Sequence, residues 1–277
     1  MLITIPAALP GSPPPKSVLD LEPLFDLLRQ CRPDAVSLMP SLGPDDLPNG
    51  PALAAIRSRL EAEGIAAVPG SWRVHATDPV ADPSWRVQSL FEIRAQIAAL
   101  GEAAMSPLVI EWDAPSQDSG EREAIVDFLL PVVEEAERAQ VRIALRLWDN
   151  PEVVSAVLRQ LDSNYLGVCY DLRQAGVRKG SALRQLEALG SHPFAFQPGR
   201  CWTTGADTLS TGAAPWKRLM TTLKQSGFSG PVLLDTVRTP VECGCAVGFM
   251  RGILATAGTG SVPGLRPPLS ISMMERG

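Results

Sequence analysis

Residues 141–171 read VRIALRLWDNPEVVSAVLRQLDSNYLGVCYD, and this stretch decides the fold class. Apolar and other side chains alternate through residues 141–148, which predicts a strand. Pro151 suits the first position of a helix, and residues 151–161 carry apolar side chains at helical spacing. Residues 165–171 again form a short apolar run. A strand, a helix and a second strand in about 30 residues predict a parallel βαβ unit.

The same alternation continues through most of the chain. Further strands are expected at residues 2–5, 35–39, 65–68, 107–112, 193–197 and 230–237. Further helices are expected at residues 17–28, 51–63, 84–100, 120–139, 181–189, 214–226 and 241–256. Eight such units fit a (β/α)₈ barrel, whose usual size is about 250 residues. The competing architecture is a doubly wound open sheet, but the turn after residues 2–5 lacks its Gly-x-Gly-x-x-Gly signature.

The sequence therefore predicts an α/β fold, a single (β/α)₈ TIM barrel over residues 1–257. A flexible tail rich in Gly, Pro and Ser is expected over residues 258–277. Hydrophobic residues make up 45% of the 277 residues, enough to bury a core of this size.

Composition excludes several classes of function. The net charge is −5 and no Lys/Arg cluster occurs, so we expect no nucleic-acid partner. No run of about 18 uncharged apolar residues occurs, so we expect no membrane span. The first 15 residues lack the basic start of a signal peptide. Five cysteines are an odd set that favours reduced thiols and a cytoplasmic location.

The active site of such a barrel lies at the carboxyl ends of the strands. Alternation along five strands puts one or two polar residues near each tip on the inward face, above small residues such as Ala144, Cys169 and Ala195. These tip residues are Glu111, Asp113, Arg146, Asp171, Gln197 and Asp235. Buried charges are costly unless they are paired, so their convergence predicts a functional site.

Three segments resemble one family of barrels. Residues 227–235, GFSGPVLLD, resemble the last-strand signature of the xylose-isomerase-like barrels, the sugar-phosphate isomerase and epimerase family. Residues 166–171, LGVCYD, resemble their sixth strand, which ends in a metal-binding Asp, and residues 141–150 resemble their fifth strand. The resemblance covers residues 1–256. It implies isomerase or epimerase activity and a divalent cation held by two Glu, one Asp and one His.

The departures from that pattern are at the metal ligands. Arg146 stands where the fifth-strand Glu is expected, and Gln174 stands where the His is expected. Asp171 is retained, and Asp235 is a shortened version of the last Glu. Two carboxylates are too few for a dedicated Mg²⁺, Mn²⁺ or Zn²⁺ site, and a guanidinium would repel a dication. We therefore expect no metal and no other cofactor, with Arg146 as the fixed positive charge.

The expected catalytic residues are Asp171 or Asp235 as general base and Arg146 as the group that stabilises an oxyanion. Substrate contacts are expected from Glu111, Gln197, Trp112, Gln174, Arg200 and His75. Trp112 is one of four tryptophans, with Trp72, Trp148 and Trp202, that follow strand ends and suggest an aromatic-lined pocket. Plainer interpretations remain: Glu111 as a solvated rim charge, His75 as a surface histidine, and Arg146 with the two aspartates as a structural ion-pair plug.

The leading hypothesis is a metal-independent isomerase, epimerase or lyase. It would act on a small polyol, keto or hydroxy-acid compound by proton transfer next to a carbonyl. The alternative is a non-catalytic barrel that binds a ligand or a protein partner, and a third hypothesis is a metal-dependent sugar isomerase or epimerase. The expected partner is a small-molecule substrate, and the sequence leaves an oligomer open.

Overall fold

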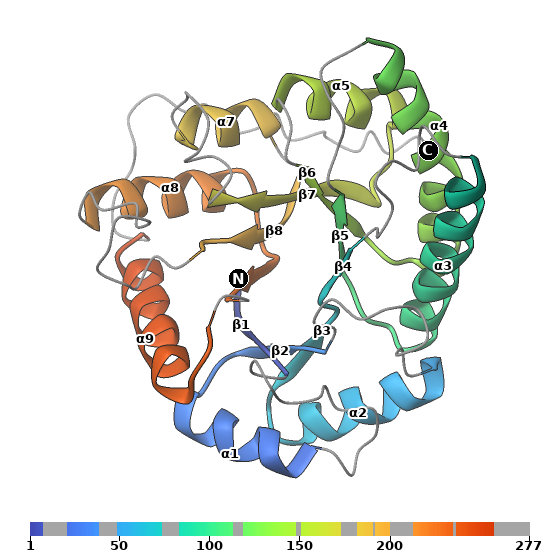
Figure 1. Cartoon of the computed structure of the whole chain (residues 1–277). Helices are drawn as coiled ribbons and strands as arrows, with labels where there is room; N and C mark the ends of the chain where they lie inside the picture. The colour runs from blue at the N-terminus through green and yellow to red at the C-terminus, as the bar shows by residue number, and fades with distance from the viewer. Residues whose placement is uncertain are drawn as a thin grey trace, which may run out of the picture.

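The computed structural model describes residues 1–7, 21–38, 49–73, 83–112, 119–147, 151–172, 182–190, 192–199, 213–234 and 237–257. This part of the chain forms a curled parallel sheet enclosed by a ring of helices (Figure 1). Strands and helices alternate along the chain, as the sequence predicts. The expected tail, residues 258–277, lies outside the described residues.

The described residues form nine strands and eight helices. The strands are β1 (Leu2–Pro6), β2 (Ala35–Ser37), β3 (Ala66–Val68), β4 (Ser71–Arg73), β5 (Leu108–Trp112), β6 (Ile143–Leu147), β7 (Leu166–Asp171), β8 (Pro193–Gln197) and β9 (Pro231–Leu233). The helices are α1 (Glu22–Cys31), α2 (Gly50–Ala62), α3 (Pro83–Glu102), α4 (Ser119–Ala139), α5 (Pro151–Leu161), α7 (Ala182–Leu189), α8 (Ala213–Gln225) and α9 (Pro240–Thr256). None of these helices is long and apolar enough to cross a membrane.

The barrel closes through a strand that is broken in two. The sheet order is β3-β2-β1-β9-β8-β7-β6-β5-β4, and all pairs are parallel. Its two end strands, β3 and β4, are separated only by Pro69 and Gly70. The proline ring has no N–H to donate to a neighbouring strand. The chain therefore pairs with β2 before Pro69, as β3, and with β5 after Gly70, as β4. The expected single third strand, residues 65–68, therefore continues as β4, where the sequence predicts a loop.

A layer of small and aliphatic side chains fills the inside of the barrel. Its members come from five neighbouring strands and are Val109, Ala144, Cys169, Ala195 and Leu233. All are at most 5% exposed. They occupy the inward positions that strand alternation predicts, one step below the polar tips. The predicted barrel and its predicted inward face are thus confirmed.

The larger core lies between the strands and the helices. Tyr170 on β7 and Phe196 on β8 point outward into it, and their rings stack with centroids 6.3 Å apart. Trp72 also belongs to this core and is 1% exposed. Trp72 is therefore a packing residue, and its expected contribution to an aromatic-lined mouth is wrong. The alternation in β4 explains this, because Trp72 faces outward between Ser71 and Arg73.

Candidate functional site

Four polar residues are buried at the carboxyl ends of four neighbouring strands. They are Glu111 on β5, Arg146 on β6, Asp171 on β7 and Gln197 on β8, with exposed fractions of 3, 3, 5 and 0%. The parallel register pairs Glu111 with Arg146 and Asp171 with Gln197. All four lie directly above the inner layer, at the end of the barrel where strand-borne active sites lie.

An arginine joins the two carboxylates of this group. Nη1 of Arg146 donates a hydrogen bond to Oε1 of Glu111. Nε of Arg146 lies 3.5 Å from Oδ2 of Asp171. The two ion pairs involve side chains that are at most 4% exposed. Burial removes each charge from water, and a buried charge is unstable without a partner. The guanidinium and the carboxylates therefore stabilise one another.

The small inner layer explains why long polar side chains fit at this level. Ala144 lies one step below Arg146, Cys169 below Asp171, and Ala195 below Gln197. A large apolar residue at any of these positions would fill the centre of the barrel. Since they are small, the tip side chains converge on the axis.

The described residues do not fit a divalent cation. Among them no group of three His, Cys, Asp or Glu side chains is close enough to hold a metal. Both buried carboxylates at the mouth are engaged by the same guanidinium. A dication at this place would displace the arginine or lie against its positive charge. Among the described residues, the donor set therefore differs from the two Glu, one Asp and one His that the resemblance implies.

Several predicted residues cannot be placed. Residues His75, Asp113, Gln174, Arg200 and Asp235 lie outside the described residues, as do Trp148 and Trp202. Trp112 ends β5, but its side chain is not described. The structure thus brings together Arg146, Asp171, Glu111 and Gln197, which are four of the predicted site residues.

Glu111 does not lie on a solvated rim. Its 3% exposure and its bond to Arg146 make it part of the buried group. One further position was not predicted. Arg73 ends β4 and pairs in register with Glu111, so its Cα lies at the same level of the barrel. Its position after Ser71 and Trp72 would have identified it if β4 had been recognised as a strand.

Two buried cysteines and the second histidine lie away from this group or beneath it. Cys169 is a 2% exposed member of the inner layer, as predicted. Burial, followed by the neighbouring Cys31 thiol, raises the pKa of the Cys243 thiol, which disfavours the reactive thiolate. His192 precedes β8 and therefore lies at the amino end of the barrel, opposite the carboxylates.

Solved structures identify the architecture. An L-ribulose 3-epimerase superimposes with a TM-score of 0.73 at 15% identity, covering 93% of this chain and 95% of that chain. A D-psicose 3-epimerase from Clostridium cellulolyticum H10, solved with D-tagatose, gives 0.70 at 15% identity, covering 92% and 99%. A xylose isomerase domain protein from Planctomyces limnophilus gives 0.67 at 12% identity, covering 92% and 97%. The chain has the fold of the xylose-isomerase-like barrels.

Sequence comparison alone does not reach this result, because no protein-family model and no curated protein matches the chain. At 12 to 15% identity the xylose-isomerase-like assignment concerns the fold. The likeness spans nearly the full length of those structures, so the whole barrel is shared. What the barrel does must be argued from its own site residues.

Proposed function

We propose that this protein is a metal-independent isomerase or epimerase of small polyhydroxy carbonyl compounds. The observation that carries the proposal is the buried group Glu111–Arg146–Asp171 at the carboxyl end of a barrel shared with sugar epimerases. These three side chains provide two carboxylates and one guanidinium, so negative charge exceeds positive charge by one. A carboxylate beside a fixed positive charge is what proton abstraction next to a carbonyl requires.

The proposed reaction is a proton transfer through an enediolate. A carboxylate, Asp171 or Asp235, accepts the proton from the carbon next to the carbonyl, and the C–H electron pair moves into the carbonyl group. The oxygen that gains negative charge is stabilised by the guanidinium of Arg146. Return of the proton to the opposite face gives the epimer, and its return to the neighbouring carbon gives the isomer. A lyase would instead expel a leaving group from the same enediolate.

Glu111 has a positioning role in this proposal. It was expected to contact substrate, but its bond to Arg146 holds the guanidinium beside Asp171. Gln197, in register with Asp171, is retained as a substrate contact, because an amide offers both a donor and an acceptor to a hydroxyl-bearing compound. His75, Trp112, Gln174 and Arg200 stay predicted substrate contacts.

The structure also contains an observation that favours the non-catalytic alternative. Arg146 is only 3% exposed and is paired on two sides, as a structural plug would be. In that case the barrel would bind a ligand or a partner without transforming it. The metal-dependent alternative has no such support, since the described carboxylates are engaged by Arg146.

Exchange of substrate protons with solvent tests the proposal. Chelator-treated protein is incubated in D₂O with D-tagatose, D-psicose or L-ribulose, the sugars named for the neighbouring structures. Deuterium appearing next to the carbonyl, read by NMR, reports proton abstraction even when no net reaction occurs. We expect incorporation by the native protein and a loss of about 100-fold or more in the variant that lacks the base, either Asp171→Asn or Asp235→Asn.

The controls separate the three hypotheses. Arg29→Gln, at an exposed ion pair on α1, should exchange protons at the native rate. Exchange that requires added Mn²⁺ would overturn metal independence while keeping the epimerase. No exchange with any of the sugars, with Asp171→Asn binding them as the native protein does, would establish the non-catalytic barrel instead.

A further inference from the structure

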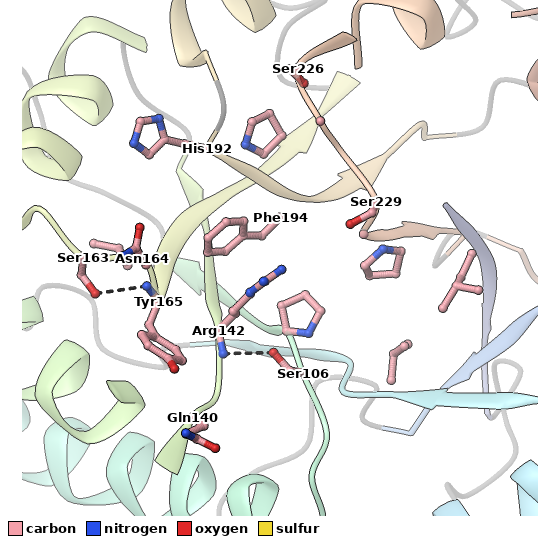
Figure 2. A pocket seen from close by; sticks show the side chains of 18 residues that line it. Ser106, Gln140, Arg142, Ser163, Asn164, Tyr165, His192, Phe194, Ser226 and Ser229 are labelled. Carbon is pink, nitrogen blue, oxygen red and sulfur yellow. Dashed lines mark hydrogen bonds between the residues drawn. The ribbon is translucent and has the colours of Figure 1, made fainter. Parts of the chain in front are cut away.

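A cavity lies at the amino-terminal end of the barrel, opposite the Arg146 group. It has a volume of about 1080 Å³ and is lined by 18 residues (Figure 2). Four of them begin strands: Leu2, Leu166, Pro193 and Pro231. Ser106 and Arg142 precede β5 and β6. The cavity is therefore built by the barrel itself, and it is far along the axis from the proposed catalytic residues.

The charge of this cavity is opposite to that of the whole chain. Among the described residues that line it, Arg142 and His192 are the groups that can carry positive charge, and none is Asp or Glu. The nearest acid in its hydrogen-bond network is Glu137, which accepts from the lining residue Ser163 at 2.6 Å. No described carboxylate forms an ion pair with Arg142. The chain as a whole has a net charge of −5.

The guanidinium is held in place by an aromatic ring. Its central carbon lies 5.3 Å from the centre of the Phe194 ring. Figure 2 shows the Arg142 side chain extending beneath that ring toward the middle of the cavity. A guanidinium stacked on a ring keeps the N–H donors in its plane available to a ligand. It also loses less conformational freedom when it binds an anion.

The ring itself depends on a β-bulge. Val168 pairs with Pro193 while the next residue, Cys169, pairs with Ala195, so Phe194 is an extra residue in β8. The bulge allows Phe194 to pack against the inner layer, on the same side as Ala195. Gly167 makes room for it, because a Cβ there would lie 2.6 Å from the ring. The bulge and Gly167 thus position Phe194, and Phe194 in turn positions the guanidinium of Arg142.

Polar side chains also line the cavity. The hydroxyl oxygen of Ser106 accepts from the backbone N–H of Arg142 at 3.0 Å, so its own hydrogen can be donated to a ligand. Nδ1 of His192 lies 3.0 Å from the carbonyl oxygen of Leu189 and must donate to it, because a carbonyl only accepts. Nε2 is then the nitrogen that a ligand can contact.

We propose that this cavity binds a small organic oxyanion, a carboxylate or phosphate joined to a flat or apolar group. The anionic oxygens are held by Arg142 with Ser106 and His192, and the flat group lies against Phe194. Such a site is independent of the proposed epimerase reaction, since none of its residues belongs to the Arg146 group.

Binding of simple probes tests this site. Inorganic phosphate, phenyl phosphate and benzoate are titrated against the native protein at constant ionic strength, with binding followed by amide shifts in ¹H–¹⁵N NMR. We expect phenyl phosphate or benzoate to bind more tightly than phosphate, with shifts at Gly167 and Gly230. Arg142→Gln should weaken binding by about tenfold or more, since it removes charge-assisted hydrogen bonds. Arg142 is exposed, so this variant retains the fold.

Three variants complete the experiment. Arg159→Gln on α5 removes another exposed arginine and should bind as the native protein does. Asp171→Asn should also bind normally, which separates this site from the catalytic one. Phe194→Leu should reduce the advantage of phenyl phosphate over phosphate. Equal affinity in the native protein and Arg142→Gln, or no shift with any probe, would overturn the proposal.

Discussion

Arg146 is a buried positive charge between two buried carboxylates at the mouth of the barrel. Its guanidinium bonds to Glu111 and lies 3.5 Å from Asp171, and all three side chains are nearly excluded from water. An arginine in this setting supplies a fixed positive charge. The stability of the group depends on all three members, because an unpaired buried charge is costly.

This dependence gives a prediction about stability. Arg146→Met removes the guanidinium that both buried carboxylates contact and should lower the free energy of unfolding by about 3–5 kcal/mol. Adding Glu111→Gln to that variant should restore part of the loss, because it removes one of the two buried negative charges. Urea denaturation of the two single variants and the double variant measures the coupling.

An exposed ion pair provides the control. Arg29 and Asp26 on α1 are 68 and 69% exposed, so Arg29→Gln should cost less than about 1 kcal/mol. If Arg146→Met costs as little as Arg29→Gln, the buried pair does not exist in solution. A double variant whose loss equals the sum of the two single losses would also contradict the account.

Strand alternation was enough to predict the residues of this group. Arg146, Asp171 and Gln197 each lie two positions after a small inward residue, and the structure puts all of them at the mouth. The partner of Arg146 could not be predicted in the same way. The register of β5 against β6, which pairs Glu111 with Arg146, identifies Glu111 as one partner of Arg146.

At the scale of the elements, two glycines inside helices have opposite roles. The helix expected at residues 84–100 extends as α3 through Gly101 to Glu102, and Ala104 takes the left-handed conformation with φ of 49°. A Cβ on Gly101 would lie 2.9 Å from both the Cβ and the carbonyl oxygen of Ala139 on α4. Gly101 therefore allows α3 and α4 to pack closely. Gly252 on α9 has nothing within 4 Å of the same position.

These contacts predict effects of opposite sign. Gly101→Ala should lower the free energy of unfolding by about 1–3 kcal/mol, because α4 backbone stands in the way of the methyl group. Gly252→Ala should raise it by about 0.5–1 kcal/mol through helix propensity alone. Thermal and urea unfolding of the two variants measures both effects. A stabilising Gly101→Ala would show that α3 and α4 are not in close contact there.

The elements that sequence reasoning placed correctly are those with long periodic patterns. Helices α4 and α5 and strands β5 to β8 agree with the expected ranges to within about two residues, the usual uncertainty of such boundaries. One short feature was missed for a local reason. β4 has three residues and follows a Pro-Gly pair, which is typical of a turn. α1 spans Glu22–Cys31 with Leu21 at the cap and no side-chain cap, and the expected start near residue 17 lies outside the described residues.

At the scale of the whole molecule, the two ends of the barrel have different chemistry. The carboxyl end of the strands gathers Glu111, Asp171 and Arg146, with an excess of negative charge among them. The amino end has a cavity lined by Arg142 and His192 and by no acid among its described residues. The strands connect the two ends through the inner layer. One fold thus carries a proposed proton-transfer site and a proposed anion site.

Metal binding by the native protein tests the central claim most directly. Chelator-treated protein is titrated with Mn²⁺, and binding is followed by calorimetry together with the melting temperature. With Arg146 neutralising the carboxylates, we expect no stoichiometric binding and no rise in melting temperature at millimolar Mn²⁺. One tightly bound Mn²⁺ per chain with a raised melting temperature would contradict the account, because Arg146 would then not hold the place of the cation.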